Sequence, residues 1–245
     1  MEENNENKNN TEEVKEEAKN ESKTVSETIS ETVSEVKEAT KNTNSKESVA
    51  MAKNFVKNFF TKPYSEMKEI AANHKPFLVI AIIILAVWVV AGLIDGIISV
   101  ANMYSLGSYY TLEGFMRNSV SSVFTIISSI LIPVIIVALL SGIIYLFMKD
   151  KKKNFLAVVI AVVVAKLPVV VASIISLLSS VGSEVAKITS AFSGFCGVLS
   201  TVLLYFAIKA LYKEEDDDKV TIKFIITMAI YYGVALVLSF FKLYI

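Results

Sequence analysis

The chain is short of the residues on which most catalytic and metal sites depend. Its 245 residues contain one cysteine, one histidine and a single arginine, Arg117. The lone cysteine, Cys196, excludes an intramolecular disulfide and lies in an apolar run, where a packing role is expected. The lone histidine, His74, excludes a histidine-based metal site or proton relay. Since nucleotide-binding fingerprints and a Ser/His/Asp set are also missing, the sequence predicts no enzyme, no cofactor and no metal.

Aromatic residues are absent from residues 1–50, which are rich in Glu, Asn, Lys, Ser and Thr. This segment carries 13 Glu against 7 Lys. It has too little apolar surface to offset its chain entropy, which predicts a disordered acidic tail. Its negative charge argues against nucleic-acid binding. Val25, Ile29 and Val33 recur at helical spacing, so a helix that orders on a protein partner is the alternative.

Five long apolar runs occupy residues 77–245, and each is long enough to cross a bilayer core of ~30 Å as a helix. The predicted fold class is therefore all-α: a polytopic membrane protein with five transmembrane helices. The second run is longer than a span needs, which a tilt, a kink at Pro133 or a start in the interface would explain. The expected spans are 77–99, 119–148, 154–180, 185–212 and 220–244.

Residues 51–76 predict an amphipathic lead-in at the membrane surface. Aromatic rings on one face would enter the headgroup region, while lysines on the other face would meet anionic lipid. Pro63 ends the first of its helices, and a second short helix is expected over residues 65–73, before Pro76. The candidate residues for the lipid interface are Lys53, Phe55, Lys57, Phe59, Phe60 and Lys62.

The distribution of lysine predicts the orientation in the membrane. Near the span ends, 13 lysines lie before the first span, between the second and third, and around the gap before the fifth. The other side has only Arg117, Lys187 and Lys242. Five spans then place the amino terminus in the cytoplasm and the carboxyl terminus outside the cell membrane. Because 23 of the 24 basic residues are lysine, an AT-rich genome and hence a bacterial source are indicated.

Lys166 is the strongest candidate for a functional residue within the membrane. It lies twelve residues after Asn154, ~18 Å into the bilayer, where a lysine is costly unless paired or hydrated. Pro168 lacks a backbone donor, so the carbonyl near Val164 would help to line a polar cavity. Asp95, late in the first span, is the expected ion-pair partner. The alternative is that Lys166 snorkels or anchors neighbouring helices.

The fourth span has small residues at four-residue spacing, a pattern that lets helices approach closely in lipid. They are Ser190, Ser193, Gly194, Gly197 and Thr201. The pattern favours packing within the helix bundle, with homodimerisation as the alternative. The five carboxylates of residues 214–218 indicate a solvated loop, because they lack the spacing and the turn glycine of a calcium loop.

Three stretches carry a family resemblance. They are the Pro-led lead-in Phe60–Pro76, the hairpin from Ile144 to Leu156, and Lys166-Leu167-Pro168 with its mid-span proline. Together with five spans, they resemble the Yip family domain of membrane proteins, named for interacting with Ypt/Rab GTPases, over roughly residues 55–245. The Asp-Leu-Tyr-Gly-Pro motif of eukaryotic members is absent. The chain thus looks like the bacterial branch, and neither Rab binding nor a catalytic residue is implied.

Two functions remain open. The resemblance implies a non-enzymatic integral membrane protein that organises membrane or recruits a protein partner, here through the basic lead-in and the acidic tail. The alternative is a small permease or the membrane subunit of a transporter, which would use Lys166, Pro168 and Asp95 together with serine-rich spans. The expected partners are the lipid bilayer, a protein that binds the tail, and a second copy of the chain.

Overall fold

The structure, a computed structural model, describes residues 34, 54–55, 57–105, 112–147, 154–212 and 216–243. The chain divides into two units, Met1–Asn44 and Ser45–Ile245, and all described residues except Ser34 belong to the second unit. The tail (apart from Ser34), Lys53 and residues 214–215 of the acidic run 214–218 lie outside the described residues, and so do the predictions for the tail and for Lys53.

The lead-in consists of two helical pieces separated at Lys62. Residues 57–61 are helical, and Lys62 leaves helical geometry with φ −140° and ψ 56°. The helix α3 (Pro63–Ala72) then begins with proline, which fits the first position of a helix because no backbone donor is needed there. A short 3-10 turn, η1 (Lys75–Phe77), leads into the first long helix.

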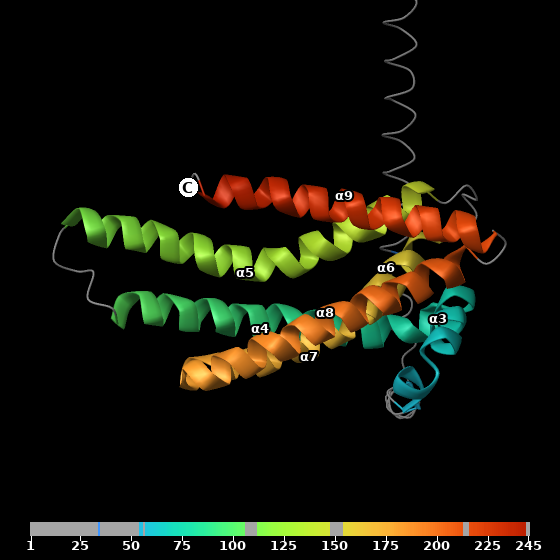
Figure 1. Cartoon of the computed structure of the whole chain (residues 1–245), viewed down its shortest axis with the longest axis horizontal. Coiled ribbons are helices and arrows are strands. Elements are labelled where there is room, and N and C mark those ends of the chain that lie inside the picture. Colours follow the sequence, from blue (N-terminus) through green and yellow to red (C-terminus); the bar gives the residue numbers. More distant parts are fainter. Residues whose placement is uncertain are drawn as a thin grey trace, which may run out of the picture. The chain divides into compact units, whose positions relative to one another are not determined.

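The helices α4 (Leu78–Ser105) and α5 (Leu112–Phe147) lie side by side and form the most extensive helix pair of the structure (Figure 1). Their sequences are apolar on all sides, as expected for helices surrounded by lipid and other helices. Pro133 lies inside α5, which continues through it as one helix. The extra length of the second apolar run is therefore helical throughout the described part.

The third span is broken. It consists of α6 (Phe155–Ala165), α7 (Leu167–Ser176) and the 3-10 segment η2 (Leu177–Val181), and the two parts meet at an angle of 42°. Asn154 caps α6 by accepting a hydrogen bond of 2.8 Å from the backbone N–H of Leu156. The break falls at Lys166, next to the mid-span proline.

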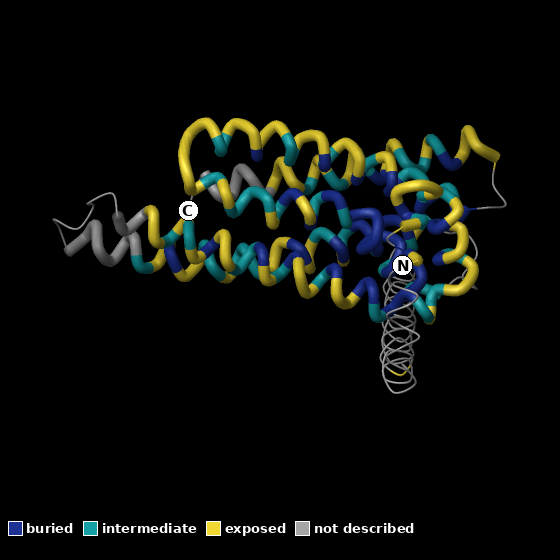
Figure 2. Tube along the Cα trace, turned by 90° about the horizontal axis from the view of Figure 1, so that it is seen from below, coloured by how far each residue is buried: buried dark blue, intermediate teal, exposed yellow. Residues whose placement is uncertain are grey.

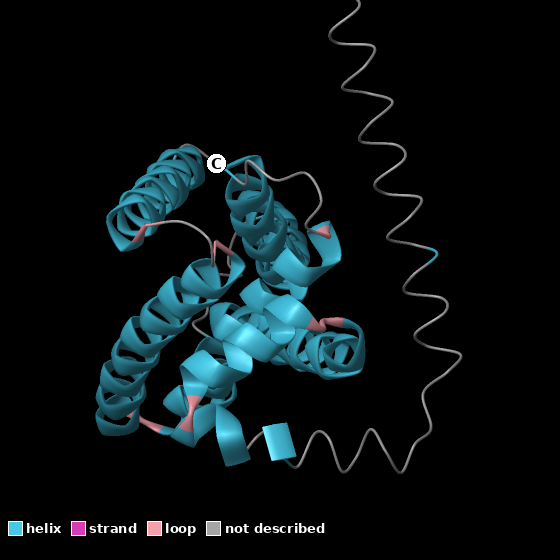
Figure 3. Cartoon of the chain, turned by 90° about the vertical axis from the view of Figure 1, so that its right-hand side faces the viewer, coloured by secondary structure: helices cyan, strands magenta, loops and turns pink. Residues whose placement is uncertain are grey.

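The last two helices are α8 (Ser183–Leu211) and α9 (Asp217–Leu243). Four single helices, α4, α5, α8 and α9, are long and apolar enough to cross a membrane, and the broken pair α6 and α7 makes a fifth if it is one span. Every regular element in the described part of the chain is a helix (Figure 3). The all-α, multi-span fold class is confirmed.

The packed core lies toward one end of the helices (Figure 2). There α3, the start of α4, the end of α5, α6, the end of α8 and the start of α9 come together. We call this the lysine-rich end, because it carries the described lysines Lys57, Lys62, Lys68, Lys75, Lys209, Lys219 and Lys223. Large, fully buried side chains of this core are Phe59, Met67, Ile70, Leu140, Ile144, Ile160, Leu204 and Ile208.

Candidate functional site

Lys166 occupies the break between α6 and α7. Its backbone (φ −85°, ψ −3°) still donates hydrogen bonds to Val162 O at 3.2 Å and Val163 O at 3.1 Å. Pro168, two residues later, has no N–H to offer the carbonyl of Val164, so the regular helical ladder is interrupted here. The sequence Lys-Leu-Pro thus accounts for the bend near the middle of the third span.

The side chain of Lys166 is buried, with 7% of its surface exposed. Its Nζ lies 5.4 Å from the centre of the Tyr231 ring on α9, within the range of a cation–π contact. Among the described residues, the ion pairs are Lys187–Glu184 and Lys209–Asp217, and neither includes Lys166. The partner that the structure gives this cation is therefore an aromatic face on another helix.

Asp95 and Lys166 are not brought together. Asp95 is exposed on α4, whereas Lys166 is buried, and the two described side chains form no ion pair. Asp95 lies 17 residues beyond the start of α4 and Lys166 lies 11 residues beyond the start of α6. That offset corresponds to ~9 Å along helices that start at the same end, more than the expected ion pair allows.

The lead-in rings face the protein more than the lipid. Phe55 and Phe59 are 3% and 2% exposed, and their ring centres lie 5.2 Å apart. Phe55 also contacts Phe77, at 5.9 Å, whereas Phe60 is 68% exposed. Phe55 and Phe59 share a helix face at four-residue spacing, and Phe60 points about 100° away. Of these rings, only Phe60 is left exposed for the predicted contact with lipid, with Lys57 and Lys62 exposed beside it.

The small residues of α8 do not pack against another described helix at their glycines. Gly194 is exposed and Gly197 partly exposed, and a Cβ added at either position would meet nothing within 4 Å. Ser190 is exposed, and Ser193 and Thr201 are partly exposed. The expected use of this face for packing within the bundle is not seen at these two glycines.

The close helix approach occurs instead between α4 and α5, at Gly92 and Gly96. A Cβ at Gly92 would lie 2.6 Å from the backbone oxygen of Ser129, and a Cβ at Gly96 would lie 2.8 Å from its Oγ. Glycine lets the two backbones meet here, as small residues do in membrane helices. The spacing Gly-x-x-x-Gly in the first span is the sequence signal by which this contact could have been found.

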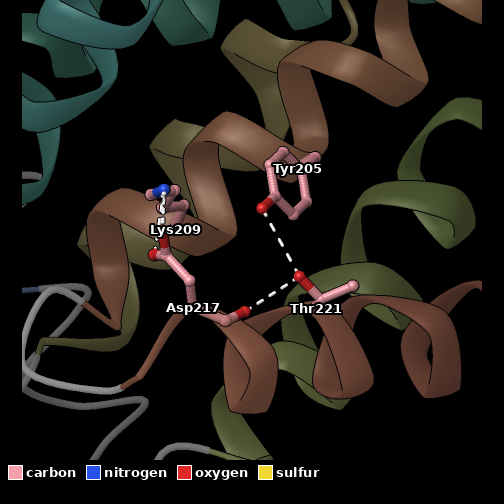
Figure 4. A network of polar contacts seen from close by, with 4 residues as sticks. All are labelled: Tyr205, Lys209, Asp217 and Thr221. Atoms are coloured by element: carbon pink, nitrogen blue, oxygen red, sulfur yellow. Dashed lines mark hydrogen bonds and ion pairs between the residues drawn. The ribbon is translucent and has the colours of Figure 1, made fainter.

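A polar bridge joins the end of α8 to the start of α9 at the lysine-rich end (Figure 4). Lys209 Nζ donates to the Asp217 carboxylate at 2.9 Å. The Thr221 hydroxyl donates to Asp217 O at 2.8 Å and lies 3.5 Å from the Tyr205 hydroxyl. The bridge therefore fixes the direction in which the chain turns from one span into the next.

A cluster around Tyr64 attaches α3 to this bridge. The Tyr64 ring lies 5.7 Å from the Phe206 ring of α8. Lys68 Nζ is 4.5 Å and Lys209 Nζ is 6.0 Å from the centre of the same tyrosine ring. We call Tyr64, Lys68, Phe206 and Lys209 the Tyr64 cluster. It places two ammonium groups from different helices beside one aromatic ring.

A third tyrosine ties α5 to α8 nearby. The Tyr212 hydroxyl donates a buried hydrogen bond of 2.6 Å to Ile144 O, and Lys223 Nζ lies 4.3 Å over the Tyr212 ring. No group of three or more His, Cys, Asp or Glu side chains suited to a metal ion occurs among the residues that the structure describes. The polar bridge, the Tyr64 cluster and the Tyr212 contacts at this end thus involve lysines, tyrosines, Thr221 and the Asp217 carboxylate.

These features define a multi-span membrane protein with an amphipathic helix docked at one end of its spans. The model of the Yip1 domain family matches residues 57–239, about three quarters of the chain. The chain therefore belongs to the Yip1 domain family, whose members are generally non-enzymatic membrane proteins. No curated protein and no solved structure matches the chain.

Proposed function

We propose that this protein is a non-enzymatic membrane protein that organises the membrane or recruits a protein partner at its lysine-rich end. The observation that carries the proposal is the docking of α3. Its Met67 and Ile70 side chains are fully buried, and Tyr64 contacts Phe206 of α8. A helix held in this way forms, with the ends of α8 and α9, a preformed polar surface at the end of the membrane spans.

We infer that this end faces the cytoplasm of a bacterial cell. Seven of the described lysines gather there, whereas Lys187, near the start of α8, and Lys242, near the end of α9, lie at the other end, in keeping with the distribution expected of cytoplasmic ends. With five spans, the carboxyl terminus then lies outside the cell membrane. The acidic tail would share the cytoplasmic side with the proposed surface and supply a second contact for a partner.

Affinity purification after crosslinking in cells tests the recruitment proposal. The full chain is compared with a chain lacking residues 1–50 and with the variant Lys68→Glu, which reverses one exposed charge of the Tyr64 cluster. We expect a stoichiometric partner that is lost or reduced in at least one of the two variants. A matched control, Lys187→Glu, changes an exposed lysine at the opposite end of α8. Absence of any partner from all four samples would contradict recruitment.

A second candidate, a small permease or transporter subunit, is favoured by the burial of Lys166 beside Tyr231 at a break in a span. The sequence predicted that a permease would use Lys166 and Asp95. The proposal rests on Lys166, because Asp95 is an exposed carboxylate on another helix. Solute uptake that is abolished by Lys166→Met in a correctly folded protein would support the permease. Uptake that is equal with and without the substitution would exclude this role for Lys166.

Homodimerisation through α8 is also proposed. Its support is the open space beside Gly194 and Gly197, which the described part of the chain leaves without a neighbour. Crosslinking of single cysteines placed at these positions would detect a dimer, and a variant with Gly194→Leu is expected to lose it.

A further inference from the structure

We propose that the Tyr64 cluster binds the phosphate group of an anionic phospholipid between Lys68 of α3 and Lys209 of α8. The inference is independent of the recruitment of a protein partner, because it concerns a lipid at the end of the spans. It is carried by the position of two ammonium groups beside one tyrosine ring, 4.5 and 6.0 Å from its centre.

Both lysines have donor capacity for a phosphate. Lys68 is exposed and makes no ion pair with a described residue. Lys209 Nζ lies 2.9 Å from both carboxylate oxygens of Asp217, whose side chain is 70% exposed, so this ion pair is of the weak, solvated kind. Since an ammonium group has three donors, at least one on Lys209 remains for a phosphate. A phosphate with several acceptor oxygens can take donors from both lysines at once.

The Tyr64 ring holds the two ammonium groups in place before a ligand arrives. A cation–π contact restricts each long side chain, and the ring itself is fixed against Phe206. Less side-chain entropy is then lost when a phosphate binds, which raises the affinity. The other described lysine beside a ring at this end, Lys223, lies over a different tyrosine, Tyr212.

The depth of the cluster favours a lipid over a soluble phosphate. Lys209 lies in the last turn of α8, a membrane-spanning helix, and so stands where a span meets the headgroup region. The exposed Phe60 ring, four residues before Tyr64, is suited to the boundary between headgroups and acyl chains. Anionic lipid attracts lysines at this depth, which a zwitterionic lipid does not do.

Lipid retention by the full chain tests the proposal. Protein purified in a neutral detergent is given equal amounts of phosphatidylglycerol and phosphatidylcholine, and native mass spectrometry counts the bound lipids. The variants are K68Q/K209Q, K68R/K209R, K68Q alone and the control K187Q/K219Q, which removes the same charge from two lysines outside the cluster. Lys187 and Lys219 are both exposed. Thermal unfolding of every variant checks its fold.

We expect the wild type to retain phosphatidylglycerol in preference to phosphatidylcholine. The affinity should fall about fivefold for each cluster lysine that is replaced by Gln, and persist in K68R/K209R and in K187Q/K219Q. Equal retention of the two lipids by the wild type, or an equal loss in K187Q/K219Q, would overturn the proposal. If K68Q/K209Q does not fold, K68Q alone decides, because Lys68 is exposed and makes no ion pair with a described residue.

A competition arm separates a lipid from a soluble ligand of the same chemistry. Inorganic phosphate, added at the concentration of the lipid, is expected to leave phosphatidylglycerol bound. Complete displacement by inorganic phosphate would show a site for soluble phosphoryl groups and overturn the assignment to lipid.

Discussion

At the scale of single residues, Lys166 shows how a buried cation is accommodated without a carboxylate. The Tyr231 face lies 5.4 Å from its Nζ, and the residue is buried at the break between α6 and α7. A hydropathy pattern predicts that a lysine lies at this depth. It does not predict Tyr231, since the two residues are 65 positions apart and meet only when α9 packs near the broken span. The sequence also favoured Asp95 as the ion-pair partner of Lys166, but this carboxylate is exposed.

The contact between Lys166 and Tyr231 can be measured with a double-mutant cycle. We combine Lys166→Met, which keeps the length of the side chain, with Tyr231→Leu, which removes the ring. The expected coupling free energy is about 1 kcal/mol, because a cation–π contact in a desolvated site is of that size. Reversible unfolding in detergent supplies the four free energies. Strictly additive losses would show that ammonium and ring do not interact.

Gly92 and Gly96 determine how closely α4 and α5 can approach. Gly92→Ala places a methyl group 2.6 Å from the backbone oxygen of Ser129, so the helices must shift, and the expected destabilisation is about 1–3 kcal/mol. Gly194→Ala is the matched control, because its methyl group would meet nothing within 4 Å. The control should be neutral or stabilising, as Ala is the better helix former. Equal melting temperatures for the two variants would contradict the contact.

At the scale of elements, α3 is an amphipathic helix whose apolar face has a protein partner. The periodicity of residues 51–76 predicts two helices with a break at Pro63, and the structure has helical residues 57–61 followed by α3 from Pro63. Periodicity does not state what covers that face, because lipid and protein select the same pattern. The structure covers it with α6 and α8, and Met67 and Ile70 are fully buried there. In the helical piece before α3, Phe55 packs against Phe59 and Phe77, while Phe60 stays exposed.

Docking of α3 should depend on pH through Glu66. Burial is the main cause that raises the pKa of this carboxyl above 4.5, with a smaller contribution from Glu69, while a hydrogen bond from Asn58 acts in the opposite direction. A raised pKa in the folded state means that ionisation weakens the fold. The stability due to protonated Glu66 is thus fully present below pH 4.5 and is lost as the pH rises through the raised pKa.

Glu66→Gln tests this dependence, because glutamine stays neutral at every pH. The stability of Glu66→Gln relative to wild type should grow as the pH is raised from 4.5 and then level off. Unfolding of both proteins in detergent across the pH range gives the difference, and Asp218→Asn, at an exposed position of α9, is the control. A relative stability that shrinks as the pH rises would show that Glu66 is stabilised in its ionised form.

Removal of the Tyr64 ring should release α3 from α8. Tyr64→Ala deletes the contact to Phe206 and the face beside which Lys68 and Lys209 lie. Faster amide hydrogen exchange is expected in Pro63–Ala72, with α4 and α5 little changed, because α3 packs mainly against α8 and α6. Tyr64→Phe keeps the ring and should retain the wild-type exchange. Unchanged exchange in Tyr64→Ala would contradict the role of the ring in docking.

At the scale of the whole membrane unit, the helices pack tightly near the lysine-rich end and expose more of their surface toward the other end (Figure 2). Run length and hydropathy predicted the long helices, and Pro168 disfavoured a straight helix in the third span. They could not predict where the core lies, because every span is apolar along its whole length and lipid and protein are equally apolar surroundings. Small residues at four-residue spacing did not show which helices pack closely either. Gly92 and Gly96 of α4 lie against Ser129 of α5, whereas a Cβ at Gly194 or Gly197 of α8 would meet nothing within 4 Å.

The central claim is that the broken segment α6 to η2 is one span, so that the chain crosses the membrane five times with its lysine-rich end in the cytoplasm. Cysteine labelling tests it directly, since the single native cysteine, Cys196, is buried and can be removed. Single cysteines are placed at Lys75 and Asp216, at the lysine-rich end, and at Gly182, which follows η2.

Intact cells are treated with a membrane-impermeant thiol reagent before and after permeabilisation. The account predicts that the cysteine at position 182 is labelled in intact cells, whereas those at positions 75 and 216 are labelled only after permeabilisation. Protection of position 182 in intact cells, with labelling of position 216 instead, would show that α6 and α7 form a re-entrant loop, because the span α8 would then cross outward. That result would contradict the five-span account.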